Sequence, residues 1–512
     1  MTESQVRLSE LLAALSLAAD LGTGMPMETT LRVCLLATRL AEAAGADQED
    51  VSATFYTGLL WSAGCTSTAH EETLRFGDDI GLKRAMAGTD FERPSEVMSH
   101  AARIGAEWGV GARLQGFSGL LRYGRAQGED VAAFHCEAAA RLASRLGLGA
   151  KALEGLGAFF EYWNGSGGPA ALKREAIPVP ARAARLAYEA VHSLRAGADP
   201  VGVVRSRAAK ELDPNLADIF ERKVTELVAD LDQESVWSET LDAEPVPRPW
   251  TPASRLDQVA EAFGDFVDLK SVYWLGHSAG VAMLAEAAAT VIRLPETDRI
   301  AVRRGARLHS LGRVAVSNRI WDKSAALSSA EWERVRLYPY FTDRVVGRAP
   351  GFVDAVRVAS GAQERLDGSG YHRGLPAAAQ PVPVRLLAAA AAYRSMIEAR
   401  PHRAALQAKT AAAELRTASA AGRLDGEAVR AVLEAAGHER RRGEWPAGLT
   451  DREVEVLRRV ARGATNRQVA ADLHISEETA RNHVKHIYEK AGVSTRAGAA
   501  LFAMEQGLFL VD

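Results

Sequence analysis

The sequence predicts an all-α protein with three helical domains. Apolar residues recur at helical spacing, as in Val281, Leu284, Ala285 and Ala288, and no strand-like alternation is prominent. Alanine is abundant and aromatic residues make up only 6% of the chain, a composition that favours helices. A length of 512 residues is typical of about three domains.

The overall composition argues against several classes of protein. There is no run of about 18 apolar residues and no signal-peptide pattern, so we expect a cytoplasmic protein with no membrane partner. Cys34, Cys65 and Cys136 are scattered without a CxxC motif, which argues against a disulfide framework and a zinc ribbon. The net charge of −3 gives no general attraction to nucleic acid, so any contact with DNA must be local.

The first two domains read as copies of one fold. Four pairs of segments match in the same order: 8–33 with 256–281, 59–65 with 307–313, 159–169 with 362–372, and 177–182 with 380–385. The offset is 248 residues for the first two pairs and 203 for the last two. The first copy is therefore expected to carry about 45 extra residues, within about 66–130.

Two charged segments divide the chain. Residues 229–254 are acidic and then Pro-rich, which predicts an extended connector, and residues 438–448 are charged and end in Pro and Gly. The expected domains are 1–230, 250–437 and 447–512.

The C-terminal domain carries clear helix signals. Thr450 with Glu453, and Thr465 with Gln468, have the spacing of capping boxes, in which side chains and backbone N–H groups pair reciprocally at a helix start. Ser476 suits the N-cap of a third helix. Gly463 and Gly492 can take the left-handed conformation that ends a helix. A fourth helix follows.

The third helix of this domain is the most informative. Its apolar face carries Ala480, Val484, Ile487 and Ala491. The opposite face is polar and is made by Glu478, Arg481, Asn482, Lys485 and Glu489, flanked by His483 and His486. Such a stripe can donate hydrogen bonds to phosphates and reach base edges in the major groove.

The C-terminal segment closely resembles the LuxR-type helix-turn-helix family. The motif positions are matched by Thr450, Arg452, Glu453, Leu457, Gly463, Asn466, Ala470, Leu473, Ser476, Thr479, His483, Val484, Ile487, Lys490, Gly492, Val493 and Arg496. The resemblance implies double-stranded DNA as a partner, a motif at about 465–484, and a homodimer on paired half-sites. The expected DNA-binding residues are Thr465, Asn466, Ser476, Thr479, Arg481, Asn482, His483, Lys485 and His486. Glu478 departs from the usual Lys and removes a cation near DNA.

The second copy resembles the HD-GYP family over about 250–420. The resemblance is carried by GHSAGV (276–281), LHSLGRVAV (308–316), ERLDGSGYHRGLP (364–376) and VPVRLLAAAAAYRSM (382–396), in that order. It implies a helical metal-dependent phosphodiesterase acting on cyclic di-GMP, in which His and Asp residues bridge two or three metal ions that activate water.

Most of the implied metal ligands are replaced. In the second copy His277 and His309 remain, while the other ligand positions hold Ser310, Tyr338, Ala362, Gln363 and Ala391, and the family's Lys is Arg313. In the first copy only His135 remains, and the other positions hold Thr29, Trp61, Ser62, Phe159, Phe160 and Tyr188. We therefore expect vestigial histidines with no metal, no cofactor and no catalytic residue. A residual mononuclear site on His277, His309 and Glu364 is the alternative.

A glycine loop survives better than the ligands. Its candidate ligand-binding residues are Arg365, Asp367, Gly368, Gly370 and Tyr371. Glycines there permit tight turns that expose backbone N–H groups to a phosphate. The alternative is a turn that only defines the fold.

These observations predict a DNA-binding transcriptional regulator. Its catalytically inactive HD-GYP-like region would serve as a sensory, dimerisation or partner-docking module, with a nucleotide or another small molecule as candidate effector. No receiver domain is indicated at the N-terminus. The alternative is a metal-dependent cyclic-dinucleotide phosphodiesterase fused to a DNA-binding tail.

Overall fold

The protein is built almost entirely of helices. The computed structural model describes residues 5–90, 93–437, 445–506 and 508. Among these residues the only sheet is an antiparallel pair, β1 (Gln5–Arg7) with β2 (Trp250–Pro252). The predicted all-α class is therefore confirmed. In the described part of the chain, no helix combines the length and the apolar character needed to cross a membrane.

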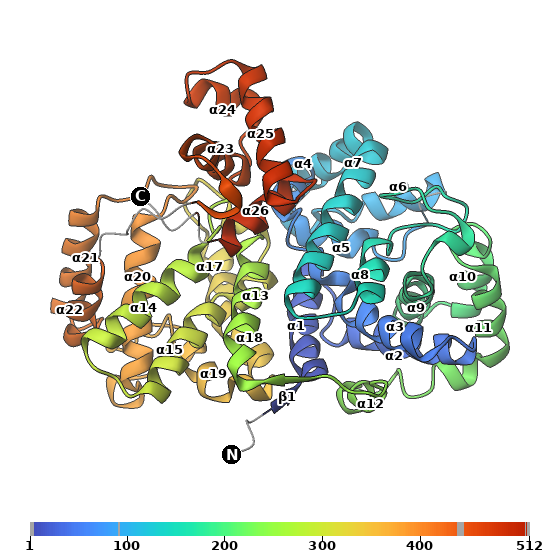
Figure 1. The fold of residues 1–512 in the computed structure, drawn as a ribbon, viewed down its shortest axis with the longest axis horizontal. Helices are drawn as coiled ribbons and strands as arrows, with labels where there is room; N and C mark the ends of the chain where they lie inside the picture. The colour runs from blue at the N-terminus through green and yellow to red at the C-terminus, as the bar shows by residue number, and fades with distance from the viewer. Residues whose placement is uncertain (1–4, 91–92, 438–444, 507, 509–512) are drawn as a thin grey trace. The chain divides into compact units, whose positions relative to one another are not determined.

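The chain divides into two compact units, residues 1–253 and 254–512, which we describe separately (Figure 1). The first unit contains the helices α1 (Leu8–Thr23), α2 (Thr29–Ala43), α3 (Gln48–Leu60), α4 (Ala69–Phe76), α5 (Asp79–Met86), α6 (Pro94–Ala101), α7 (Val110–Arg145), α8 (Ala150–Gly157), α9 (Val179–Arg195), α10 (Pro200–Arg207), α11 (Pro214–Leu227) and α12 (Trp237–Asp242), with short 3₁₀ helices η1 (Trp61–Gly64), η2 (Ala106–Trp108) and η3 (Arg174–Ala176).

The first unit is organised around α2. This helix is buried along most of its length and packs against α3 and α9, because apolar or small residues occupy nearly every turn. Helices α4, α5 and α6 lie between η1 and α7 and have a small apolar cluster of their own, made by Phe76, Ala85, Ala101 and Ile104. This part of the chain falls within the predicted insertion at about 66–130.

The segment 229–254 is not the extended connector that the sequence predicts. It contains α12, whose Thr240 and Leu241 are buried and which packs on α2, and it ends in β2. Glu28 accepts hydrogen bonds from Ser235 Oγ at 2.9 Å and from the Val236 backbone N–H at 2.8 Å. The prediction was wrong because the few apolar residues of this segment are buried against α2, which its acidic and Pro-rich composition conceals.

Over residues 254–437, the second unit contains the following α-helices. They are α13 (Leu256–Asp268), α14 (His277–Val291), α15 (Glu296–Leu308), α16 (Asn318–Trp321), α17 (Ser329–Arg336), α18 (Tyr338–Val346), α19 (Val353–Ser360), α20 (Val382–Ile397), α21 (Ala408–Ala420) and α22 (Gly426–Ala435), with 3₁₀ helices η5 (Leu311–Ala315), η6 (Pro350–Phe352) and η7 (Ala377–Ala379). Helix α14 packs against α15 and α20, as α2 does against α3 and α9 in the first unit.

Matching hydrogen bonds recur in the two units at the offsets noted in the sequence. The Asp20 carboxylate accepts from the backbone N–H and hydroxyl of Thr30, and the Asp268 carboxylate accepts from the same groups of Ser278. A Cβ built on Gly64 would lie 2.1 Å from the His135 carbonyl oxygen, and one on Gly312 would lie 2.0 Å from that of Tyr338. Glycine is therefore required at both positions for the same close approach.

The C-terminal helices are α23 (Asp451–Ala461), α24 (Asn466–Asp472), α25 (Glu477–Ala491) and α26 (Arg496–Glu505), preceded by η8 (Pro446–Gly448). Both predicted capping boxes are present, and the Ser476 side chain caps α25. Gly463 and Gly492 have φ of 88° and 64°. The predicted linker at 438–448 lies outside the described residues over 438–444.

Candidate DNA-binding surface and buried polar cluster

Helix α25 presents a polar surface to solvent. Ala480 and Ile487 are buried, and Val484 and Ala491 pack partly buried against the same apolar core, as the sequence predicts. Arg481, Asn482, Lys485 and His486 are exposed, and His483 is half-buried. Lys485 makes only a long ion pair on this helix, 3.9 Å from Glu489, with both side chains largely exposed. An exposed pair of this kind is worth little, so Lys485 can exchange it for a phosphate at small cost.

The remaining predicted contact residues lie at the starts of two helices. Thr465 is the N-cap of α24 and Asn466 is its first residue, while Ser476 and Thr479 lie at the start of α25. The Ser476 and Thr479 hydroxyls are 2.8 Å apart and exposed. The fold thus brings Ser476 and Thr479 onto the same helix as Arg481, Asn482 and Lys485, and places Thr465 and Asn466 on the preceding helix.

Other residues of the motif stabilise the domain. Lys490 Nζ lies 2.7 Å from the Glu453 carboxylate, which also accepts from the Thr450 backbone N–H. Arg452 donates to the Leu473 carbonyl at 2.7 Å, and Arg496 donates to that of Ala464. These cations join the helices to the turns between them and are engaged within the protein.

The loop between α13 and α14 contacts the C-terminal domain. Leu269 and Leu275 pack against its apolar core, and a Cβ on Gly463 would lie 3.3 Å from Val272 Cγ1. All of these residues belong to the second unit. The same loop leads directly into His277, so it joins the predicted DNA-binding domain to the predicted vestigial site.

His277 and His309 do come together, with ring centroids 5.3 Å apart. Both are fully buried. His309 Nδ1 lies 2.7 Å from the Ala306 carbonyl and its Nε2 lies 3.1 Å from Ser310 Oγ. His277 Nδ1 lies 2.7 Å from the Glu398 carboxylate, and its Nε2 lies 3.5 Å from Arg313 Nη2. Every ring nitrogen of the pair therefore faces a protein group.

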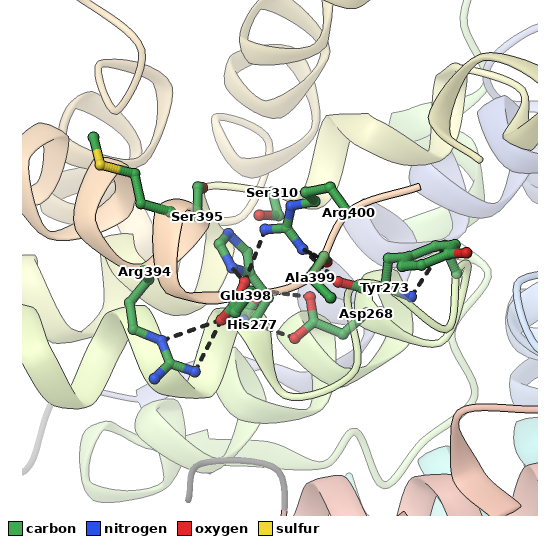
Figure 2. A network of polar contacts seen from close by, with 12 residues as sticks. Asp268, Tyr273, His277, Ser310, Arg394, Ser395, Glu398, Ala399 and Arg400 are labelled. Carbon is green, nitrogen blue, oxygen red and sulfur yellow. Dashed lines mark hydrogen bonds and ion pairs between the residues drawn. The ribbon is translucent and has the colours of Figure 1, made fainter. Parts of the chain in front are cut away.

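Glu398 is the centre of this polar cluster. Figure 2 shows its carboxylate between His277, Arg394 and Arg400. Arg394 lies 2.9 Å and Arg400 2.8 Å from its oxygens. The Arg394 side chain passes over α14 at Gly280, where a Cβ would lie 2.5 Å from Nη2. Arg400 also donates to the Tyr273 carbonyl, which fixes the loop before His277.

Burial controls the protonation of these groups. Burial lowers the pKa of His277 to about 4, and it also lowers the pKa of His309 well below its usual value. The pKa of Glu398 is held far below its usual range despite burial, because it accepts a hydrogen bond from His277 and also touches two guanidinium groups. Near neutral pH the cluster therefore holds neutral histidines, an ionised Glu398 and cationic arginines.

The corresponding place in the first unit is filled by aromatic rings. Trp61 stacks on Phe159 with centroids 4.8 Å apart, and Tyr188 meets Trp61 edge-on at 4.9 Å. His135 packs on Phe160 at 5.1 Å, and its Nε2 lies 2.6 Å from the Trp61 carbonyl. Burial lowers the pKa of His135 to about 4. The aromatic residues at the implied ligand positions of the first copy therefore pack against one another here.

The glycine loops are closed by their own hydrogen bonds. Asp367 Oδ1 accepts from the backbone N–H and the hydroxyl of Ser369, and Asn164 does the same for Ser166. Glu364 accepts from the Arg373 and Leu375 backbone N–H groups, so its carboxylate is engaged in holding this loop. A Cβ on Gly370 would lie 2.3 Å from the Arg365 backbone nitrogen. These contacts favour a turn that defines the fold.

The available donors do not fit a metal centre. Among the described residues, no group of three or more His, Cys, Asp or Glu side chains is arranged to hold a metal ion. The Arg313 guanidinium faces His277 Nε2, the one ring nitrogen of that residue left as an acceptor, and would repel a cation there.

Sequence reasoning missed Glu398, Arg400 and Trp274. The only local signal was the four-residue spacing of Arg394 and Glu398, which pairs the last turn of α20 with the residue that follows the helix. The pairing of Glu398 with His277 spans 121 residues and has no sequence signature.

Both parts of the second unit match known protein families. Residues 261–428 match the family described as HD domain, and residues 447–503 match the family described as bacterial regulatory proteins, luxR family. A nitrate/nitrite response regulator protein homolog of Haemophilus influenzae is 47% identical over 58 residues, which cover 11% of this chain and 28% of that protein.

A further relative spans both units. The 3'3'-cGAMP-specific phosphodiesterase 3 of Vibrio cholerae is 29% identical over 405 residues, covering 77% of this chain and 87% of that protein. A crystal structure of a cyclic GMP-AMP-specific phosphodiesterase of V. cholerae superposes with a TM-score of 0.59 at 24% identity, over 85% of this chain and 99% of that one, which is a likeness of fold. The chain thus joins an HD-type helical region to a C-terminal DNA-binding domain of the LuxR family.

Proposed function

We propose that this protein is a transcriptional regulator that binds double-stranded DNA through α25, and that its HD region acts as a sensory, dimerisation or partner-docking module without hydrolysing phosphodiesters. The observation that carries the proposal is a contrast between two sites. The polar face of α25 is exposed and unencumbered, whereas the ring nitrogens of His277 and His309 are occupied by protein groups.

The chemistry of α25 suits the major groove. Arg481 and Asn482 can pair with two acceptors or with an acceptor and a donor on base edges, and Lys485 supplies a point charge for phosphate. The hydroxyl and amide groups of Thr465, Asn466, Ser476 and Thr479 suit phosphate contacts that fix the register. Half-sites one helical turn apart require two such helices, so the active form is a homodimer. Because its proposed target is DNA, we place the protein in the cytoplasm.

The HD region supports sensing through its connection to the DNA-binding domain. The loop of residues 269–276 contacts that domain through Leu269, Val272 and Leu275, and Arg400 holds its backbone at Tyr273. A ligand or partner that moves this loop would change the support of the DNA-binding helices. The loop at Arg365, Asp367, Gly368, Gly370 and Tyr371 remains a candidate effector contact. In this account the functional parts are 1–230, 250–437 and 447–512.

DNA binding is tested with the full chain. Genomic fragments selected by binding should be retarded in gel-shift assays, and Arg481→Ala combined with Asn482→Ala should abolish the preference for them. Lys409→Ala, a change of an exposed lysine on α21, is the matched control and should bind as the wild type does. Equal retardation of selected and random fragments by the wild type would contradict the assignment.

A phosphodiesterase is the second candidate, favoured by the relative that covers 77% of the chain. Incubation with 3'3'-cGAMP and added Mn²⁺ or Fe²⁺ distinguishes a regulator without hydrolytic activity from a phosphodiesterase. Our proposal predicts no linear product above a protein-free blank. Turnover that His277→Ala abolishes would establish the enzyme instead. Calorimetry with 3'3'-cGAMP in the absence of added metal tests binding without hydrolysis.

A further inference from the structure

The buried cluster of the second unit contains polar atoms that have no partner. Arg313 is only 5% exposed, and its Nε and Nη1 have no hydrogen-bond partner among the described residues. Two neighbours share this property. Trp274, whose ring centroid lies 3.7 Å from Arg313 Cζ, has an unpartnered Nε1, and Tyr338, at 5.2 Å, has an unpartnered hydroxyl. Burying such groups without acceptors is costly.

The same place has an excess of positive charge. The Arg313 side chain lies 3.5 Å from His277 Nε2 and stacks on the Trp274 ring, and Arg400 Cζ also lies 3.7 Å from the Trp274 ring centroid. Of the nearby carboxyl groups, Glu398 is engaged by His277, Arg394 and Arg400. Asp268 lines the same space as Arg313, but it accepts from Ser278, and burial raises its pKa well above the usual value, which favours its uncharged form. A buried guanidinium without a counter-charge is unfavourable.

We propose that this cluster is a binding site for a phosphoryl oxyanion, with the Arg313 guanidinium, the Trp274 indole N–H and the Tyr338 hydroxyl as its donors. The proposal rests on the sensory role given above to the HD region. A guanidinium edge offers two N–H groups to two phosphate oxygens. Two further donors from other elements suit a third oxygen, which a carboxylate does not have. Arginine charge here takes the place of metal charge in binding a phosphate.

The site is closed in the absence of ligand. The space between Asp268, Lys270, Trp274, Arg313 and Trp321 is filled by side chains and has no room for a water molecule. An oxyanion must therefore separate the Trp274 ring from Arg313. Trp274 lies on the loop of residues 269–276, and its neighbours Val272 and Leu275 contact the DNA-binding domain. Occupation of the site would thus displace the loop that supports α23 to α26.

The test measures oxyanion binding to the full chain without DNA. Inorganic phosphate, at constant ionic strength against chloride, should raise the melting temperature of the wild type and give a saturable calorimetric titration. Arg313→Gln should bind phosphate at least about tenfold more weakly, the loss expected for one charge-assisted contact. Trp274→Phe, which keeps the ring and removes the N–H, should weaken binding by a smaller factor. The matched control is Arg430→Gln, a change of an exposed arginine on α22, which should bind as the wild type does.

Several outcomes decide the proposal. Arg313→Gln should melt no lower than the wild type in phosphate-free buffer, because it removes an unpaired buried charge, and this result separates lost binding from misfolding. Tighter binding of AMP than of phosphate would support the site and would identify a nucleotide as the molecule that carries the phosphoryl group. Binding of phosphate but not of AMP would support the site with free phosphate as its ligand. Binding of neither, or equal binding by Arg313→Gln, would overturn the proposal. Because no DNA is present, such a failure leaves the DNA-binding function untouched.

Discussion

Corresponding places in the two units are filled in opposite ways. In the first unit Trp61, Phe159, Phe160 and Tyr188 fill the place with stacked and edge-on rings. In the second unit His277 and His309 persist beside an ionised Glu398 and three arginines. Burial of rings stabilises the fold directly, whereas a buried charge cluster stabilises little and retains the capacity to bind. This place is therefore a packing core in the first unit and a polar site in the second.

The largest effect is expected from opening the aromatic core. Trp61→Ala should lower the free energy of unfolding by about 3–5 kcal/mol, because it removes a stacked ring and leaves a cavity. The measurement is urea unfolding of the full chain. Trp250→Ala, which changes a side chain that is 53% exposed, should stay within about 0.5 kcal/mol. Equal losses of unfolding free energy in the two variants would contradict the view that these rings form a packing core in the first unit.

The polar site is sensitive to loss of the Glu398 carboxylate. Glu398→Gln should cost about 3 kcal/mol or more, because Arg394 and Arg400 would remain buried without their counter-charge. The matched change is Glu434→Gln, which breaks the exposed pair with Arg430 and should cost about 0–1 kcal/mol. A Glu398→Gln variant as stable as the wild type would contradict the charge assignment.

The pH dependence of stability distinguishes a buried neutral histidine from an exposed one. The pKa of His135 is about 4 in the folded state and about 6.5 when unfolded, so the unfolded state takes up the proton first as the pH falls. Stability is therefore lost between about pH 6.5 and pH 4, by about 3 kcal/mol for this group. His135→Asn should reduce the slope of stability against pH by about one proton in that window. An unchanged slope in His135→Asn would contradict the burial of a neutral histidine at this position.

The smallest effect concerns single residues of α25. Lys485→Ala should weaken binding to all DNA sequences and reduce the salt dependence by about one counterion. Arg481→Ala should instead change the preference at one base pair, by about 1–3 kcal/mol. Gel shifts over a range of salt concentrations measure both. If Arg481→Ala weakened binding to all sequences equally, or if Lys485→Ala changed the sequence preference, the roles assigned to these two residues would be wrong.

Local signals were read correctly from the sequence. The capping boxes at Thr450 and Thr465, the cap at Ser476 and the glycine turn at Gly492 depend on residues within a few positions of one another, so their spacing is sufficient. The apolar face of α25 follows from helical periodicity for the same reason.

Long-range pairings were not predicted. Glu398 acquires its role only because α20 delivers it to His277, and Trp274 becomes important only when Arg313 lies over its ring. The segment 229–254 was wrongly expected to be extended, because burial of Thr240 and Leu241 depends on α2, almost 200 residues earlier. The composition of a segment does not reveal the distant residues against which it packs.

The central claim is tested most directly by mapping the DNA that the protein occupies across its own genome, in parallel for the wild type and for a variant with Arg481, Asn482 and Lys485 all changed to alanine. We predict discrete sites that share a two-fold symmetric sequence for the wild type, and their disappearance for the variant at equal protein level. Sites that persist unchanged in the variant would contradict the assignment of α25 as the DNA-reading helix.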